Sequence, residues 1–226
     1  MTILVFAPHA DDEVLGVGGT IARHVADGEH VILAVLTGSG DGDHPIWPNA
    51  LWDEIHRECA NSSKILGIQE VIFENLPAAC LDFTAGWKIN KVVEDILQKA
   101  EPSVVYIPFL HDLHKDHAAI AYAAHVATRS YLKSASSIRR ILAYETLSET
   151  HVVPPYYANP FCPNVFVNIE STIDLKIEAM KAYRSQLQPD GFPRSLAAIR
   201  ALATMRGSNI ASSAAEAFML IGDYSR

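Results

Sequence analysis

Two short polar segments contain residue types that can bind a metal ion and move a proton. The first, 8–13, reads Pro-His-Ala-Asp-Asp-Glu and holds four ionisable side chains within five residues. Such a cluster directly after a buried strand is costly unless its charge is compensated, and a divalent cation would do so. His9 and Asp12 are three residues apart and can be aimed at one ion, which leaves Asp11 as a base for a metal-bound water. Helix capping is the alternative, but two Asp and a Glu exceed what a cap needs.

The second polar segment, 108–117, contains three His and two Asp within its last seven residues. His114 and His117 can face the same side of a first helical turn because they are three residues apart. Catalytic zinc sites use three protein ligands and keep one position open for water. His9, Asp12 and one of these two histidines would therefore complete a site with two His and one Asp.

The remaining polar side chains of the second segment suit supporting roles. Asp112 or Asp116 could orient the ligand imidazoles. His111 is better interpreted as an exposed loop residue or a helix cap. Six other histidines stand alone and are predicted to lie on the surface or on helix faces: His24, His30, His44, His56, His125 and His151.

Apolar runs alternate with amphipathic stretches along the first 132 residues. The predicted strands are Ile3–Ala7, Val31–Leu36, Glu70–Phe73 and Val104–Phe109. The predicted helices are Glu13–Asp27, Leu51–Leu66, Trp87–Ala100 and Ala118–Leu132. This alternation predicts an α/β protein, a Rossmann-like three-layer fold with a mostly parallel sheet and helices on both faces. Ligands bind beyond the carboxyl ends of strands in such sheets, and both polar segments follow a predicted strand.

The last third of the chain is less regular. Its predicted strands are Arg140–Glu145, Asn164–Val167 and Ala217–Ile221, and its predicted helices are Thr172–Tyr183 and Leu196–Met205. The segment Val152–Pro163 holds four Pro and is predicted to be a loop or surface flap. We expect one domain over 1–226, because no repeat or linker divides the chain.

The glycines in 16–20 do not form a dinucleotide-binding motif. They fall inside a predicted helix instead of at the strand-to-helix turn, and the spacing of that motif is absent. Close packing of the helix on the sheet explains them better.

Composition narrows the class of protein. The formal net charge is −8, which disfavours nucleic acid and anionic membrane surfaces as partners. Three widely separated Cys indicate reduced thiols, and no apolar run approaches the length of a membrane span. We therefore expect a soluble cytoplasmic protein without nucleic-acid or membrane partners.

The pair of segments 8–13 and 112–117 resembles the motifs of the LmbE-like, or PIG-L, family of zinc-dependent N-deacetylases. The usual first motif of that family has proline after the histidine, whereas Ala10 stands there in this chain. Further resembling segments are Arg57-Glu58 with 64–67, 183–186, Arg206-Gly207 and 215–218. The resemblance therefore spans nearly the whole chain.

The resemblance implies a role for each motif residue. The zinc ligands would be His9, Asp12 and His117. Asp11 would be the general base that deprotonates the zinc-bound water. His114, as a protonated imidazole oriented by Asp116, would polarise the amide carbonyl and stabilise the oxyanion. Iron or cobalt could replace zinc at such a site.

Substrate contacts are expected from three further residues. Arg57 resembles a family position that reaches the ligand, and its guanidinium suits sugar hydroxyls or a phosphate. Asp112 lies beside the metal motif, and Asp41 lies in a glycine-rich loop. Trp47, Trp52 and Trp87 could stack on a sugar ring, although aromatic residues at helix starts are more often core.

The leading hypothesis is a zinc-dependent hydrolase that removes acetyl from an N-acetylglucosamine-type conjugate, a small-molecule substrate. Related alternatives are an amidohydrolase acting on a thiol conjugate or an antibiotic intermediate, and a metal- or sugar-binding module without turnover. Members of the family often form homo-oligomers, so the resemblance allows a homo-oligomer, although the sequence does not indicate the oligomeric state.

Overall fold

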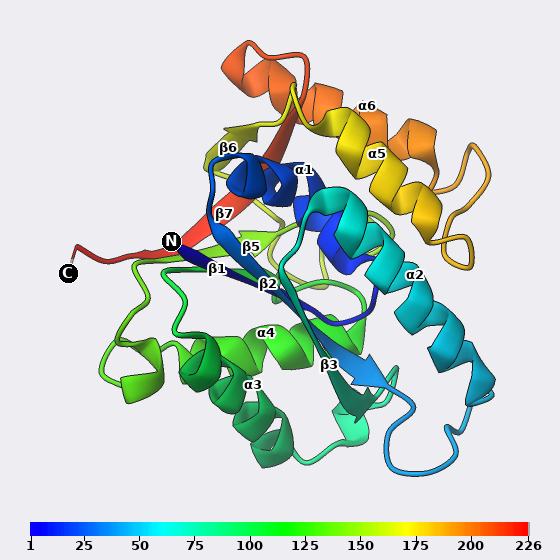
Figure 1. The fold of residues 1–226 in the computed structure, drawn as a ribbon, viewed down its shortest axis with the longest axis vertical. Coiled ribbons are helices and arrows are strands. Elements are labelled where there is room, and N and C mark those ends of the chain that lie inside the picture. The colour runs from blue at the N-terminus through cyan, green and yellow to red at the C-terminus, as the bar shows by residue number, and fades with distance from the viewer. Residues whose placement is uncertain (226) are drawn as a thin grey trace.

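A seven-stranded sheet lies between two layers of helices in this computed structural model, which describes residues 1–225 (Figure 1). The strand order is β3-β2-β1-β4-β5-β7-β6. The strands are β1 (Thr2–Ala7), β2 (His30–Gly38), β3 (Glu70–Pro77), β4 (Val104–Pro108), β5 (Arg140–Tyr144), β6 (Val165–Asn168) and β7 (Ala215–Asp223). Strands β1 to β5 are parallel, and β7 is antiparallel to both β5 and β6. The predicted α/β class with a mostly parallel sheet is confirmed.

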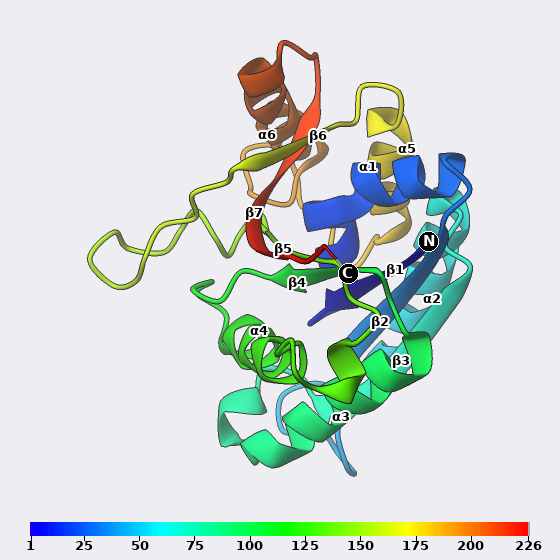
Figure 2. The ribbon, with the colours of Figure 1, turned by 90° about the vertical axis from the view of Figure 1, so that its left-hand side faces the viewer.

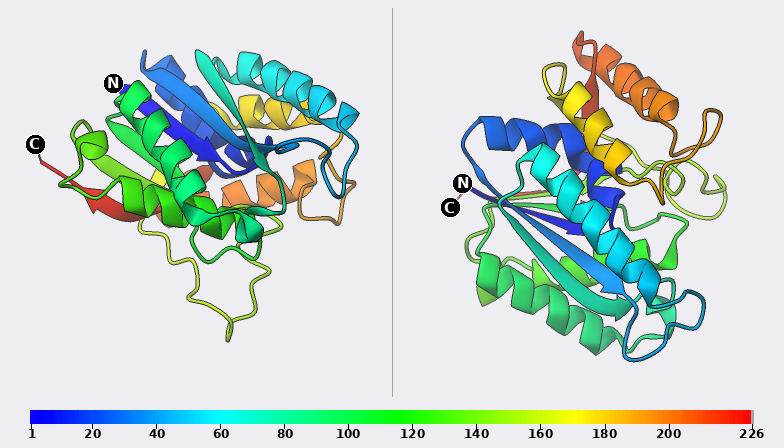
Figure 3. Two further views of the ribbon diagram at one scale, coloured as in Figure 1. Left: turned by 90° about the horizontal axis from the view of Figure 1, so that it is seen from below. Right: turned by 45° about the vertical axis from the view of Figure 1, so that its right-hand side comes forward.

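Helices cover both faces of the sheet, as Figures 2 and 3 show from other directions. One face carries α1 (Asp12–Ala26), α2 (Ala50–Leu66), α5 (Ile173–Ala182) and α6 (Leu196–Gly207). The other face carries α3 (Gly86–Ala100) and α4 (Lys115–Ala127). Short 3₁₀ helices lie at Leu81–Phe83, Lys133–Ala135 and Ser208–Ile210.

Each central strand contributes to two cores. In β1, Ile3 and Val5 belong to the core under α1, whereas Leu4 and Phe6 belong to the core under α3 and α4. Successive side chains of a strand point to opposite faces, and both faces of this sheet are covered. The central strands therefore read as continuous apolar runs without polar alternation.

Two element boundaries differ from the prediction in ways that matter for the site. Helix α4 begins at Lys115, three residues before its predicted start, because the side chain of His114 accepts a hydrogen bond from the main-chain N–H of Asp116 and caps the helix. Strand β3 continues to Pro77, because its pairing with β2 resumes after a bulge. The first places Asp116 and His117 in a helical turn, and the second brings the chain after β3 to the same edge of the sheet.

The connection between β5 and β6 extends away from the body of the molecule (Figures 2 and 3). Within it, Val152–Pro163 contains no helix or strand, so the predicted loop is confirmed. Among residues 1–225, no helix combines the length and the apolarity that crossing a bilayer requires.

Candidate active site

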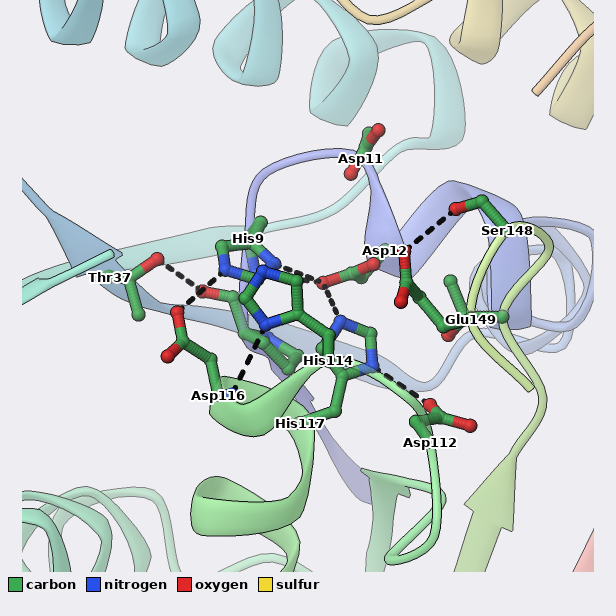
Figure 4. Close-up of polar contacts among 12 residues, drawn as sticks. His9, Asp11, Asp12, Thr37, Asp112, His114, Asp116, His117, Ser148 and Glu149 are labelled. Carbon is green, nitrogen blue, oxygen red and sulfur yellow. Dashed lines mark hydrogen bonds and ion pairs between the residues drawn. The ribbon is translucent and has the colours of Figure 1, made fainter. Parts of the chain in front are cut away.

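The two polar segments meet at the carboxyl ends of β1 and β4, which are neighbours in the sheet. After β1 the chain continues to β2 on one side, and after β4 it continues to β5 on the other. This reversal of direction is a topological switch point, where open α/β sheets bind their ligands. Figure 4 shows side chains from both segments pointing toward one another.

The turn between β1 and α1 has a constrained backbone. The main-chain oxygen of Pro8 accepts hydrogen bonds from the Oγ1 of Thr37 at 2.7 Å and from its N–H at 3.2 Å. Asp11 has a φ of 129°, a region that residues with a Cβ rarely adopt. Asp12 begins α1, and its Oδ2 accepts the main-chain N–H of His9 at 2.8 Å. The strained turn therefore presents Asp11 and Asp12 in different directions (Figure 4).

The three predicted metal ligands converge. Asp12 Oδ2 lies 3.3 Å from His9 Nδ1 and 3.2 Å from His117 Nε2. One donor atom of each residue lies within 4.8 Å of the other two. Two imidazole nitrogens and one carboxylate oxygen are a donor set that divalent transition metals accept. The residues present therefore fit the metal that the sequence implies.

Each ligand imidazole is held from behind by a buried carboxylate. His9 Nε2 donates to Asp116 Oδ2 at 2.9 Å, and His117 Nδ1 donates to Asp112 Oδ2 at 2.8 Å. Asp112 Oδ1 also accepts the hydroxyl of Thr150 at 2.6 Å. Such partners fix ring orientation and raise the basicity of the opposite nitrogen, which is the one that faces Asp12 here.

Two roles expected of these carboxylates need correction. Asp112 was expected to contact substrate, but its side chain is fully buried and engaged by His117 and Thr150. Asp116 was expected to orient His114, and it contacts that ring through its main-chain N–H. Its carboxylate instead binds His9 and accepts the main-chain N–H groups of Ala79 at 2.6 Å and Leu81 at 3.1 Å. The reason is the chain after β3, which reaches this edge and which the sequence did not place there.

His114 is oriented by a main-chain group. Its Nδ1 accepts the N–H of Asp116 at 3.2 Å, so the neutral ring carries its proton on Nε2. Burial, together with the charge of His9, lowers the pKa of His114 to about 4. The expected protonated imidazole does not fit this geometry, whereas a neutral N–H donor does.

The charges of the ligand residues stabilise one another. Burial lowers the pKa of His9, but its hydrogen bonds with Asp116 and Asp12 outweigh burial and raise the pKa to about 9. Burial favours the neutral form of Asp12, yet the charge of His117 holds the pKa of Asp12 well below its usual range. The carboxylates of Asp12, Asp112 and Asp116 thus favour positive charge at these imidazoles, and a divalent cation on the near nitrogens would take the place of the protons there.

Asp11 has a different environment from Asp12. Burial and the charge of Asp12 raise the pKa of Asp11 to about 8, while the guanidinium of Arg194 opposes that rise. Arg194 Nη1 donates to Asp11 Oδ2 at 3.3 Å and to Gln186 Oε1 at 3.2 Å. A carboxyl whose pKa is near neutrality can both accept and return a proton.

Arg194 is a site residue that sequence reasoning missed. It lies in the irregular segment between α5 and α6, and nothing in its local sequence distinguishes it. The neighbouring 183–186 segment did carry a signal through its resemblance. Tyr183 donates to Glu13 Oε1 at 2.6 Å, and Ser185 donates its hydroxyl to Glu58 Oε2 at 2.6 Å. These bonds tie the segment to α1 and α2, which brings Arg194 to the site.

A cavity of about 470 Å³ opens above these residues. Its lining residues are His9, Ala10, Asp11, Asp12, Leu15, Thr37, Trp47, Leu51, Trp52, Ile55, Ala78, His114, His117, Ser148, Glu149, Gln186 and Arg194. Ser148 and Glu149, also missed from the sequence, come from the connection after β5 (Figure 4). Arg57 and Asp41, expected to bind substrate, are exposed and lie outside this lining. Arg57 lies on the face of α2 that faces solvent, and Asp41 lies in an exposed loop.

Of the isolated histidines, His44 lies neither on the surface nor on a helix, whereas His24 lies on helix α1 as expected but is half-buried. His44 is buried, and its Nε2 donates to the main-chain oxygen of Ala78 at 2.8 Å. His24 is half-buried between Glu29 and Tyr106, with Nε2 at 2.9 Å from the Tyr106 hydroxyl. Ala78 and Tyr106 come from distant parts of the chain, so the local sequence held no sign of these contacts.

Comparison with known proteins shows consistent likenesses. The profile of the family described as PIG-L, GlcNAc-PI de-N-acetylase, matches residues 4–128. An uncharacterized deacetylase of Escherichia coli (strain K12), YaiS, is 31% identical over 192 residues, which cover 81% of this chain and 90% of that protein. The diacetylchitobiose deacetylase of Thermococcus kodakarensis is 25% identical over 198 residues, which cover 83% of this chain and 71% of that protein. The crystal structure of the conserved protein TT1542 from Thermus thermophilus has a TM-score of 0.75 at 28% identity, and the match covers 99% of this chain and 96% of that chain.

Proposed function

Because this chain belongs to the PIG-L family, we propose that it is a zinc-dependent hydrolase that removes the acetyl group from an N-acetylated amino sugar conjugate. The observation that carries the proposal is the convergence of His9, Asp12 and His117 beside Asp11. The acetamido sugar is proposed because a relative is named for the deacetylation of diacetylchitobiose. We take the conjugate to be N-acetylglucosamine-type and the chain to act as one domain.

His9, Asp12 and His117 would hold the ion, which as a Lewis acid lowers the pKa of a water molecule to about 7 and polarises a carbonyl. The far nitrogens of both imidazoles already donate to carboxylates, which leaves the near nitrogens for the metal. Zinc suits two imidazoles and one carboxylate with an open position.

Asp11 acts as the base in this mechanism. It removes a proton from the attacking water as the new carbon–oxygen bond forms at the amide carbon. It then returns that proton to the nitrogen as the carbon–nitrogen bond breaks, so that acetate and the free amine leave. Arg194 contacts Asp11 and favours its ionised form before attack.

His114 stabilises the negative charge that develops on the amide oxygen. It lines the cavity, and its neutral ring presents Nε2–H because Nδ1 is occupied by the N–H of Asp116. A preorganised donor of this kind contributes roughly 10²–10³-fold in rate. Asp116 supports the site twice, through its main chain to His114 and through its carboxylate to His9.

Acetate release from N-acetylglucosamine conjugates tests the proposal. We expect activity that chelator removes and zinc restores. Asp11→Asn should lower kcat by about 10²–10⁴-fold, because it removes the base and keeps the shape. Its bound zinc, measured by elemental analysis, should equal that of the wild type. Asp82→Asn, an exposed residue outside the cavity, is the matched control. Wild-type rate in Asp11→Asn, or activity that is indifferent to metal, would contradict the mechanism.

A further inference from the structure

Part of the cavity wall is apolar and comes from α2 and the loop before it. Its members are Trp47, Leu51, Trp52 and Ile55, here called the aromatic wall. On the helix, Ile55 shares a face with Leu51 and Trp52, because it follows them by four and three residues. The aromatic wall is continuous with the metal-ligand residues, since both line the same cavity.

The aromatic wall differs from the rest of the inner face of α2. Further along the helix, Cys59 and Leu66 are buried in the core. Leu51 and Trp52 are only half-buried, Trp47 is 37% exposed, and among residues 1–225 none of these three packs into the hydrophobic cores. Contiguous apolar surface that a protein leaves uncovered marks a binding site, because covering it is favourable.

The aromatic wall is held in place by His44. The ring of His44 stacks on Trp47 with centroids 4.9 Å apart and meets Trp52 edge-on at 5.4 Å. Its Nδ1 accepts the main-chain N–H of Trp47 at 3.2 Å, while its Nε2 donates to the oxygen of Ala78. The next residue, Ala79, donates to Asp116. The loop that contains Ala78 and Ala79 therefore connects the aromatic wall to the residues around the metal ligands and fixes their relative position. This preorganisation lowers the conformational entropy that the side chains lose when a ligand binds.

The chemistry of the aromatic wall selects its occupant. Two indoles and two aliphatic side chains offer two polar groups, the indole N–H groups of Trp47 and Trp52, and the Trp52 Nε1 is buried without a hydrogen-bond partner among the described residues. A second sugar could stack a ring face on an indole, but hydroxyls that meet Leu51 and Ile55 would have no partners on this wall, which is costly. An alkyl or aryl group covers the same surface without that cost. The volume of about 470 Å³ is in the range of cavities that take ligands larger than a monosaccharide.

We propose that the substrate is an N-acetyl amino sugar whose anomeric substituent is apolar, either alkyl or aryl, and packs on Trp47 and Trp52. The inference rests on the proposed function and specifies its substrate class. The polar end of the substrate reaches His114 and Asp11, and the apolar end lies on the aromatic wall. His44 is a positioning residue for that end.

The test measures kcat/KM for acetate release from the methyl, octyl and phenyl glycosides of N-acetylglucosamine and from diacetylchitobiose, using the zinc-loaded enzyme. We expect the octyl and phenyl glycosides to exceed the methyl glycoside by about tenfold or more. Trp47→Ala should reduce that ratio to near one. Trp87→Ala is the matched control, because Trp87 is 69% exposed and lies outside the cavity lining, and it should keep the ratio.

Binding is measured separately, so that this inference and the proposed function can fail independently. Dissociation constants for the same glycosides come from tryptophan fluorescence in wild type, Trp47→Ala and Trp87→Ala. Acetate release with no preference for the octyl and phenyl glycosides, or with diacetylchitobiose preferred, overturns the inference alone. Preferential binding of apolar glycosides that depends on Trp47, without acetate release, supports the aromatic wall and overturns the proposed function. If the enzyme shows no preference for apolar glycosides and releases no acetate, both the inference and the proposed function are overturned.

Discussion

Helix α1 touches two buried charge clusters that solve the same electrostatic problem differently. At its start, Asp12 and the imidazoles of His9 and His117 point donor atoms at a common position. At its middle, Lys176 Nζ donates to Glu216 Oε1 at 2.6 Å and to the main-chain oxygen of Leu15 at 2.9 Å. Glu216 in turn accepts the main-chain N–H groups of Gly19 at 2.9 Å and Thr20 at 2.7 Å.

The difference lies in what each cluster leaves unfinished. Lys176 and Glu216 neutralise each other, and main-chain groups of α1 take up their remaining hydrogen bonds, so that pair needs no ligand. In the other cluster, Asp112 and Asp116 occupy the far nitrogens of the imidazoles, and the near nitrogens face Asp12. Buried charge by itself therefore does not identify a site; convergence of donor atoms toward a shared position does.

The largest effect is expected when the buried ion pair of Lys176 and Glu216 is broken. Lys176→Met should destabilise the fold by about 3–5 kcal/mol, because it leaves the Glu216 carboxylate buried and unpaired. The double variant Lys176→Met/Glu216→Leu should recover most of that loss, since an apolar pair of similar size is often as stable as a buried ion pair. Urea unfolding measures both. A loss below about 1 kcal/mol in the single variant would show that the pair is not desolvated as the structure indicates.

A smaller effect sharpens the contrast at the metal-ligand cluster. Asp112→Asn should weaken zinc binding by about 10–100-fold, because it removes the carboxylate behind His117 while keeping a hydrogen-bond acceptor. Competition with a chromogenic chelator measures the affinity, with Asp82→Asn as control. Free energies of unfolding measured without metal should change less than in Lys176→Met. Unaltered zinc affinity would mean that the Asp112 carboxylate contributes only to the stability of the fold and not to metal binding.

The smallest effect comes from a charge pair at the surface. Lys91 and Asp95 form an exposed i, i+4 ion pair on α3. Lys91→Ala should change the free energy of unfolding by no more than about 0.5 kcal/mol, because solvent screens the pair. Urea unfolding beside Lys176→Met gives the comparison. A large loss of stability in Lys91→Ala would show that burial does not explain the difference between this pair and the Lys176–Glu216 pair.

For the glycines of α1, the sequence predicted close packing but did not show which residues pack against them. The 16–20 segment predicted close packing instead of nucleotide binding. A Cβ at Gly16 would lie 2.2 Å from the ring of Tyr144 on β5, and one at Gly19 would lie 2.6 Å from Ile169. The close packing is confirmed. Lys176, which lies 3.2 Å from a Cβ built at Gly18, had no signal in the sequence.

The pattern of residue types was enough to predict the sheet, its helical layers and the convergence of two polar segments. Apolar periodicity is a local property, and parallel strands place their carboxyl ends at one edge, so the meeting of His9 and Asp12 with a histidine of the second segment was predictable. The resemblance to the family singled out His117. Tertiary contacts set which carboxylate binds which imidazole, that the Nδ1 of His114 accepts the main-chain N–H of Asp116, and that Arg194 and the aromatic wall line the cavity. Those features depend on loops whose paths are set by contacts between distant residues, such as Ala79 with Asp116 and Ser185 with Glu58. Local patterns of residue type do not encode such contacts.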